Sequence, residues 1–390
     1  MRLSVAKPCH VVHLVYRFAT GGLENVIVQL INGLPHQSFR HTVVALTEAD
    51  PAFAARITRP DVEVISLNKR PGQPFGLYPK VYRLLRRLKP DVLHSCNLAA
   101  MEFAPMAALA RIPLRVHAEH GWDVGELGGS NARYRFLRRL YKPFVHEFIA
   151  VAEPQRDYLL NQIGVPAARL HFIPNGVDIE RFRPRQDDDA PPAGFPFRQG
   201  EHWVIGTIGR QALVKNPLLL VEAFIQLVQS NAPGTADMRL VMVGEGPLHE
   251  AIAQRIAEVN IADKVWLAGV RADIPELLRA MDCFVLPSLS EATSCTLQEA
   301  MATGLPIIAT QVGGNAALLK NGRYGSLIPS EDTSALAAEL LKQYGLRAEG
   351  DHLAARASII QRYGLDDVLA RYAALFGGKL QHQTQPVNSV

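Results

Sequence analysis

Short apolar runs alternate with stretches of helical spacing along the whole chain. Each run has four to seven residues with few polar positions, which is typical of strands buried on both faces of a parallel sheet. The predicted strands of the first half are 10–15, 41–46, 62–67, 91–96, 114–120 and 147–152. Those of the second half are 203–209, 239–244, 265–269, 283–287, 306–309 and 325–328. This alternation predicts βαβ units in an α/β fold, with functional loops at the carboxyl ends of the strands.

Helical spacing fills the stretches between these strands. The helices predicted most clearly are 77–88, 98–110, 132–142 and 350–375. Residues 183–200 are rich in Pro, Asp, Gly and Arg, which indicates a linker or an irregular insertion. We therefore predict an N-terminal Rossmann-like domain over 1–178 and a C-terminal one over 179–365. The polar residues 377–390 are expected to form a disordered tail.

The stretch from Ser288 to Gly304 places a strand end, a polar loop and a helix start together. The strand at 283–287 precedes it, and Leu297, Ala300 and Met301 then recur at helical spacing. Either Thr293 or Ser294 is the expected N-cap. Free backbone N–H groups and the positive end of the helix dipole would point at one spot, which suits a phosphate.

Two carboxylates, Glu291 and Glu299, bracket this spot with seven residues between them. A carboxylate accepts hydrogen bonds only, so beside a ligand it must face hydroxyl groups or a cation. A sugar nucleotide meets both needs, with phosphates at the helix end and hydroxyls at the acids. Spacing alone leaves the alternative open that Glu291 is a surface loop acid and Glu299 an exposed helix acid.

The stretch resembles the Glu-x7-Glu signature of retaining glycosyltransferases of family 4, which have the GT-B fold. The resemblance rests on Glu291, Glu299 and the run Glu-Ala-Met-Ala-x-Gly-x-Pro-Ile-Ile-Ala, with Ala292 where many members have Gly. It implies two Rossmann-like domains that face each other across a cleft, and a C-terminal helix, 366–376, that crosses back to the N-terminal domain. It also implies that Glu291 faces the donor sugar and Glu299 the nucleotide ribose.

A second motif, from Gly209 to Pro217, carries two cations after a predicted strand. Arg210 and Lys215 could both meet a diphosphate, because Asn216 is a plausible helix cap and Pro217 suits the first helical position. The resemblance implies that both cations contact the donor diphosphate, and it places Val270 against the nucleobase. The remaining donor-binding residues expected in this domain are Gly244, Thr293, Ser294, Cys295 and Thr296.

Gly21, Gly22 and His120 are the candidates in the first domain. The two glycines stand between a predicted strand and a predicted helix, where backbone can approach a phosphate, although a simple tight turn is the alternative. His120 closes a predicted strand and precedes a glycine, whereas a lone histidine is more often structural. The resemblance implies that the glycines approach donor or acceptor and that His120 contacts the donor sugar. We therefore expect His120, Arg210, Lys215 and Glu291 to be the catalytic residues.

The net charge of +4 hides an asymmetry between the two halves. Residues 1–185 carry 25 Lys and Arg against 15 Asp and Glu, a balance of +10, and the remainder carries 16 against 22, a balance of −6. Much of the basic charge lies in two amphipathic helices, at 80–89 and 133–142. These features indicate an anionic membrane surface or a phosphorylated acceptor, although a solvated helix face explains each helix as well.

Three further features of the sequence indicate the cellular compartment and whether a metal is needed. They are the cysteines, the N-terminus and one acidic run. Four cysteines form no Cys-x-x-Cys pair and favour buried thiols over disulfides or metal ligands. The N-terminus lacks a signal-peptide pattern, and no apolar run approaches the ~18 residues of a membrane span. These observations predict a cytoplasmic protein, and the basic helices are compatible with a peripheral position at the inner face of the plasma membrane. Asp187–Asp189 lies in the linker and not after a strand, so we expect no metal and no cofactor.

The predicted activity is therefore a retaining, metal-independent sugar transfer, in exopolysaccharide or other cell-surface synthesis. The expected partners are a UDP- or GDP-linked sugar and a saccharide or polyprenyl-linked acceptor, with no nucleic acid. One alternative is a GT-B-type UDP-sugar epimerase, which would normally lack the combined Arg210, Lys215, Glu291 and Glu299 set. The other is a non-catalytic two-domain nucleotide- or ligand-binding protein, which needs a Gly-x-Gly-x-x-Gly that residues 16–25 do not supply.

Overall fold

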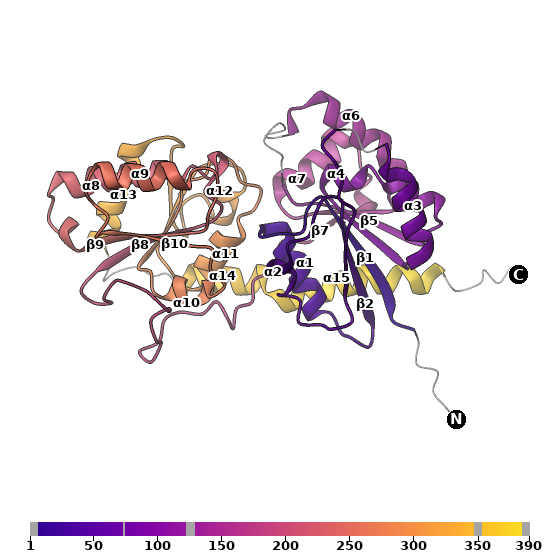
Figure 1. Cartoon of the computed structure of the whole chain (residues 1–390), viewed down its shortest axis with the longest axis horizontal. Helices are drawn as coiled ribbons and strands as arrows, with labels where there is room; N and C mark the ends of the chain where they lie inside the picture. The colour runs from indigo at the N-terminus through magenta and orange to yellow at the C-terminus, as the bar shows by residue number, and fades with distance from the viewer. Residues whose placement is uncertain (1–6, 73–74, 122–128, 347–352, 384–390) are drawn as a thin grey trace, which may run out of the picture. The chain divides into compact units, whose positions relative to one another are not determined.

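A computed structural model describes residues 7–72, 75–121, 129–346 and 353–383 (Figure 1). The chain packs as two compact units, Met1–Gly176 with Asp366–Val390, and Val177–Leu365. Each unit has a parallel sheet with helices on its faces, so the two-domain α/β prediction is confirmed. In the described residues, no helix is both long enough and apolar enough to span a bilayer.

The first unit contains a seven-stranded parallel sheet with the order β3-β2-β1-β4-β5-β6-β7. Its strands are β1 (Cys9–Val15), β2 (Phe39–Ala45), β3 (Glu63–Ser66), β4 (Val92–Cys96), β5 (Leu114–Glu119), β6 (Glu147–Ala150) and β7 (Leu170–Phe172). Its α-helices are α1 (Gly22–Gly33), α2 (Pro51–Ala54), α3 (Leu77–Leu88), α4 (Asn97–Met101), α5 (Ala104–Leu109), α6 (Ala132–Tyr141), α7 (Glu153–Asp157) and α15 (Leu365–Gln383). The strand order changes direction between β1 and β4, which is where α/β sheets bind ligands.

Helices α1 and α15 cover part of one face of this sheet. Tyr372 and Phe376 of α15 are buried in one apolar cluster with Val11 of β1 and Leu30 of α1. Helix α15 therefore belongs to the first unit by packing, although it follows the second unit in sequence. It also continues to Gln383, beyond residue 376 where the crossing helix was predicted to end, and residues 384–390 lie outside the described part.

Two local predictions for the first unit were wrong. The helix predicted over 98–110 is broken between α4 and α5, because Pro105 has no N–H to donate to the preceding turn. Strand β7 was missed because it is only three residues long and partly exposed, so it lacks a continuous buried run. It pairs with β6 and extends the sheet by one strand.

The second unit contains a six-stranded parallel sheet with the order β10-β9-β8-β11-β12-β13. Its strands are β8 (Trp203–Ile208), β9 (Met238–Val243), β10 (Val265–Gly269), β11 (Cys283–Leu286), β12 (Ile307–Thr310) and β13 (Ser326–Ile328). Its α-helices are α8 (Pro217–Ser230), α9 (His249–Glu258), α10 (Ile274–Arg279), α11 (Cys295–Ala302), α12 (Asn315–Leu318), α13 (Thr333–Gly345) and α14 (Leu353–Tyr363). Since β9 and β11 flank β8 on opposite sides, the loops after β8 and β11 meet where the strand order reverses.

Candidate functional site

The loops that follow β8 and β11 are joined to each other by their backbones. Leu289 N donates to Val214 O at 2.8 Å. The β8 loop contains a short 3-10 turn, Leu213–Lys215, and Pro217 then begins α8 as predicted. Asn216 occupies the cap position with a left-handed φ of 45°, but its side chain makes no cap hydrogen bond. The structure thus brings the two predicted motifs together at one edge of the second sheet.

Lys215 and Glu291 form an ion pair between these loops. Lys215 Nζ lies 2.6 Å from Glu291 Oε1, and Ser288 Oγ donates to the same oxygen at 2.6 Å. Thr310 Oγ1 in turn donates to Ser288 O at 2.6 Å. Glu291 is only 8% exposed, so the alternative that it is a surface loop acid is wrong. The carboxylate is held in place before any ligand arrives.

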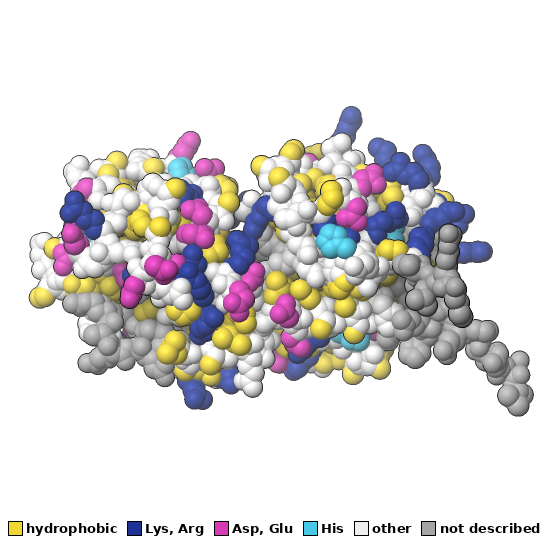
Figure 2. Space-filling view, turned by 90° about the horizontal axis from the view of Figure 1, so that it is seen from below, with side chains coloured by type: hydrophobic (Ala, Val, Ile, Leu, Met, Phe, Trp, Pro, Cys, Tyr) yellow, Lys and Arg dark blue, Asp and Glu magenta, His cyan; other side chains and the backbone are white. Residues whose placement is uncertain are grey.

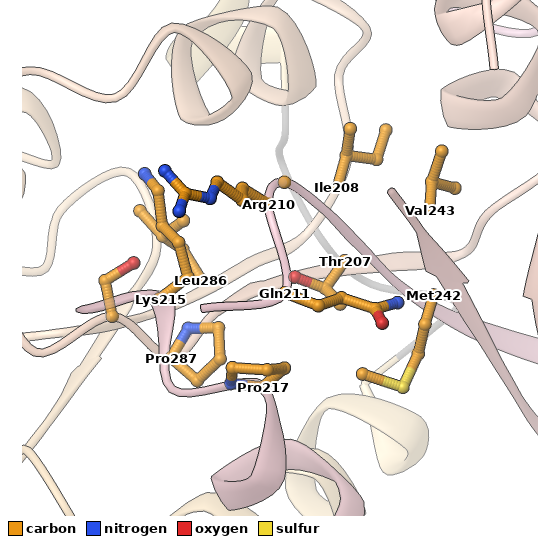
Figure 3. A pocket seen from close by; sticks show the side chains of 12 residues that line it. Thr207, Ile208, Arg210, Gln211, Lys215, Pro217, Met242, Val243, Leu286 and Pro287 are labelled. Carbon is orange, nitrogen blue, oxygen red and sulfur yellow. The ribbon is translucent and has the colours of Figure 1, made fainter. Parts of the chain in front are cut away.

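Arg210 lines a pocket at the carboxyl end of β8 together with Gly209, Lys215 and Ser288. In Figure 3 the Arg210 and Lys215 side chains extend toward the same side of this pocket. Among the described residues, no carboxylate forms an ion pair with Arg210, whose side chain is exposed. Arg210 is therefore available to an anion in solution, whereas Lys215 already shares its charge with Glu291.

Gln211 also lines this pocket, and its side chain is hydrogen-bonded to His249 of α9. Gln211 is 2% exposed, and its Oε1 lies 2.8 Å from His249 Nδ1. Its Nε2 is buried and makes no hydrogen bond within the described structure. A buried N–H without an acceptor is costly, so a ligand oxygen in the pocket would gain a donor there.

Helix α11 begins beside the β11 loop, as the sequence predicts. Ser294 is the N-cap, and its Oγ accepts from Leu297 N at 3.3 Å. Thr293 precedes the cap, Cys295 and Thr296 lie in the first turn, and Glu299 lies farther along the helix, partly buried. The helix N-terminus therefore adds backbone N–H groups to the edge that carries Arg210 and Lys215.

Three glycines allow backbone segments to approach this site closely. Gly313 has a φ of 51°, and a Cβ there would collide with Glu291 O. A Cβ on Gly314 would meet Ala292 O, and a Cβ on Gly244, with φ 117°, would meet Gly209 O. Gly244 follows β9 and Val270 follows β10, with the Val270 side chain 60% exposed. The predicted donor-binding residues of this unit are thus distributed over the loops of four neighbouring strands.

The predicted residues of the first unit lie at the start of α1 and directly after β5. Gly21 caps α1, Gly22 begins it, and a Cβ on Gly21 would contact the Glu24 carboxylate. Burial raises the pKa of Glu24 to about 7. His120 follows β5, and its backbone N donates to Asn97 Oδ1 at 2.8 Å. Burial lowers the pKa of His120 to about 4, so its imidazole is neutral at physiological pH.

The basic helix predicted over 132–142 is only partly a surface helix. Arg138 is 2% exposed, and its Nε lies 2.6 Å from Glu119 Oε1. The other side of α6 exposes Phe136 (63%) and Leu140 (50%) beside exposed Arg133 and Arg139. Figure 2 shows Lys and Arg side chains gathered at one end of the first unit, toward α3. The solvated-face interpretation is therefore wrong for Arg138, which is a core residue.

Sequence reasoning missed several groups that shape the two sites. They are Glu24, Gln211, Ser288, Thr310 and Gly313. Only Glu24 had a local signal, since it follows the glycine pair at the start of a helix. The others matter through contacts with residues that are distant in sequence, and no local pattern announces such contacts.

Comparison with known proteins identifies related sequences over both units. Residues 20–181 match the family model "Glycosyltransferase Family 4", and residues 202–344 match "Glycosyl transferases group 1". The UDP-Gal:alpha-D-GlcNAc-diphosphoundecaprenol alpha-1,3-galactosyltransferase of Escherichia coli is 29% identical over 266 residues, which cover 67% of this chain and 68% of that protein. The GDP-mannose-dependent alpha-mannosyltransferase of Mycobacterium tuberculosis is 27% identical over 333 residues, 78% of this chain and 81% of that protein.

Solved structures share the fold of the whole chain. A glycosyltransferase from Rickettsia africae has a TM-score of 0.75 at 18% identity, covering 98% of this chain and 100% of its own. HepE of Anabaena, solved in complex with UDP, has a TM-score of 0.74 at 21% identity, covering 94% and 99%. Given the two matching family models and this shared architecture, the chain belongs to the family-4 glycosyltransferases, which have the GT-B fold.

Proposed function

We propose that this glycosyltransferase moves a sugar, with retention of configuration, from a UDP- or GDP-linked donor to a saccharide or polyprenyl-linked saccharide. The observation that carries the proposal is the convergence of Arg210 and Lys215 with Glu291 where the second sheet reverses its strand order. One relative is named for UDP-galactose and an undecaprenol-linked acceptor, and another for GDP-mannose. The proposal therefore includes both UDP- and GDP-linked donors and a lipid-linked acceptor. It also includes a role in cell-surface or exopolysaccharide synthesis.

The donor diphosphate would be held by Arg210, Lys215 and the N-terminus of α11, from Thr293 to Thr296. Cations and oriented N–H groups fixed in a pocket stabilise phosphate charge without rearranging when that charge grows. Glu291 would accept hydrogen bonds from donor-sugar hydroxyls, and Glu299 from the ribose. His120, neutral at physiological pH, would contact the donor sugar through a ring nitrogen.

The transfer step needs no covalent intermediate on the protein. The bond from the anomeric carbon to the leaving phosphate breaks, and the acceptor oxygen bonds to the same face of that carbon. The acceptor hydroxyl proton passes to an oxygen of the leaving phosphate, so charge and atoms balance without an oxidant. The protein then contributes mainly electrostatic stabilisation of the diphosphate.

A panel of nucleotide sugars tests the donor half of this proposal. A ligand that binds only the folded state stabilises it by about 2.7 kcal/mol when the ligand concentration is 100 times the Kd. UDP- or GDP-linked sugars should therefore raise the melting temperature of the protein. Nucleotide release should then require acceptor, apart from slow hydrolysis. Conversion of one UDP-sugar into its epimer, without nucleotide release, would instead assign the epimerase activity. Stabilisation by no member of the panel would refute the donor class.

Transfer should survive treatment with EDTA. Arg210, Lys215 and the α11 N-terminus supply the positive charge that a metal would otherwise bring to the diphosphate. Asp189 is held by Arg183, with Nη2 to Oδ1 at 2.6 Å, so the acidic run in the linker already has a protein cation. Initial rates before and after dialysis against EDTA measure this. Loss of transfer that Mg²⁺ or Mn²⁺ restores would contradict the expectation.

The first unit should bind anionic vesicles through the exposed side of α6. Phe136 and Leu140 lie one turn apart beside Arg133 and Arg139, which is the composition of an interfacial helix. Each basic residue near an anionic surface contributes about 1 kcal/mol. The double variant Phe136→Ser, Leu140→Ser should partition less onto anionic vesicles in a sedimentation assay.

Leu109→Ser is the matched control, because Leu109 is 64% exposed on α5 of the same unit. The control should sediment like the wild type, and added salt should weaken the binding of both. Equal partitioning of the wild type onto neutral and anionic vesicles would remove the membrane proposal and leave the transferase proposal standing.

A further inference from the structure

A buried cluster in the first unit joins two histidines and a cysteine. His94 and Cys96 end β4, and His120 follows the neighbouring strand β5. One ligand atom from each of the three residues lies within 4.8 Å of the other two. Within the described ranges this is the one group of three or more His, Cys, Asp or Glu side chains with such spacing.

Hydrogen bonds fix which atoms of this cluster face one another. His94 Nδ1 lies 3.0 Å from His13 Nδ1, and His13 Nε2 lies 3.0 Å from His41 Nδ1. Cys96 Sγ lies 4.0 Å from His94 Nδ1 and 3.8 Å from His94 Nε2, and Nε2 is the nitrogen that the His13 contact leaves open. A ligating histidine is ordinarily held in this way, with its second nitrogen bonded to an outer group that sets the tautomer and the ring orientation.

His120 supplies the observation that points to a ligand. Both of its ring nitrogens are buried, and neither makes a hydrogen bond of normal geometry. The Asn175 side chain lies near the ring and raises the pKa of His120 slightly, against the larger effect of burial. The residue as a whole is partly exposed, so the cluster lies near the surface of the first unit. The Asn97 hydrogen bond to its backbone N holds the residue in position.

We propose that His94 Nε2, Cys96 Sγ and one ring nitrogen of His120 bind a single soft divalent cation of the zinc type. Two imidazoles and one thiolate are ligands that Zn²⁺ prefers, and three protein ligands leave a fourth position for water. On binding, the metal replaces the thiol proton of Cys96, which passes to the solvent. The spacing of the cysteines in the sequence favoured a buried thiol for Cys96. The metal site was not recognised because His120 comes close to Cys96 only in the folded chain.

This site predicts inhibition by zinc. If His120 contacts the donor sugar, as the proposed function has it, an ion on its ring would remove that contact. The ion is therefore not a cofactor of transfer, and its binding is compatible with full activity in EDTA. Metal binding itself does not depend on the proposed function, so the two can be tested separately.

Cobalt titration of the EDTA-treated, dialysed protein tests the site directly. Co²⁺ is the probe because a cobalt–thiolate bond gives a charge-transfer absorption band, and Zn²⁺ should abolish that band by displacement. The wild type should bind one Co²⁺ with this band. Cys96→Ser should lose the band and weaken binding by about 100-fold or more, since even outer-shell changes cost about 10- to 100-fold.

Cys9→Ser is the matched control, because Cys9 lies on β1 of the same sheet and should leave the titration unchanged. His94→Gln is the second variant and should also lose the band. Near-UV circular dichroism of each variant checks that it is folded. Absence of the band in the wild type, or equal titrations of Cys9→Ser and Cys96→Ser, would overturn the proposal. Zn²⁺ should inhibit transfer by the wild type and spare Cys96→Ser, and equal inhibition of both would contradict inhibition through this site.

Discussion

Arg210→Ala should lower kcat by about 10²- to 10³-fold, or roughly 3–4 kcal/mol, as loss of one preorganised donor does at an oxyanion site. Negative charge grows on the leaving phosphate as the glycosidic bond breaks. A cation fixed beside that phosphate interacts more strongly with the late charge than with the intact donor, and only such differential binding accelerates the step. Arg210 suits this role because no carboxylate of the described residues pairs with it and it lines the pocket.

Saturating-donor kinetics decide between this role and simple donor binding. A kcat near the wild-type value with a raised KM would mean that Arg210 only helps to hold the donor. Arg210→Lys should restore part of the loss, because a point ammonium cannot replace a two-pronged phosphate contact. Arg198→Ala is the control: Arg198 is 77% exposed in the same unit, in a surface pair with Glu201, and its loss should leave kcat unchanged.

Arg138→Met should destabilise the first unit by about 3–5 kcal/mol, because it leaves the Glu119 carboxylate buried without its cation. Arg138 and Glu119 side chains are 2% and 1% exposed, and the Arg138 guanidinium also lies over the Tyr158 ring, 5.5 Å from its centroid. Arg138 and His117 together hold the pKa of Glu119 down to about 2 despite its burial. Urea denaturation followed by circular dichroism measures the loss.

The double variant Arg138→Met, Glu119→Gln separates the lost ion pair from lost packing. Replacing both charges removes the unpaired carboxylate, so the double variant should be more stable than Arg138→Met alone. Arg133→Ala, at an exposed position of the same helix, should change stability by less than about 0.5 kcal/mol. If Arg138→Met is as stable as Arg133→Ala, the buried ion pair does not support the fold.

The strands could be predicted from sequence because parallel strands buried on both faces are continuous apolar runs. The exceptions follow from the same physics, since β7 is short and half-buried and Pro105 interrupts a pattern that is otherwise helical. Arg138 could not be recognised as a core residue, because its partner Glu119 lies on a strand 19 residues earlier. An arginine in a basic amphipathic helix looks exposed until its carboxylate is located.

Local sequence motifs were enough to name Arg210, Lys215 and Glu291 as candidates. The groups that hold Glu291 in place were missed, because the fold brings them together from separate parts of the chain. Arg210, Lys215 and Glu291 each stand in a recognisable strand-loop-helix context. The Ser288 and Thr310 hydrogen bonds that hold Glu291 in place join separate segments of the chain. Gly313 is required because a Cβ there would strike the Glu291 carbonyl, 22 residues away in the sequence, and no local pattern shows that approach.

Transfer on the face that the diphosphate leaves is tested most directly by the configuration of the product. The wild-type enzyme would be given an α-linked nucleotide sugar, labelled with ¹³C at the anomeric carbon, and an acceptor that supports nucleotide release. The anomeric coupling of the first-formed product is then read by NMR. Attack beside the phosphate that Arg210 and Lys215 are proposed to hold predicts an α-glycosidic product, and a β-glycosidic product would contradict the proposal.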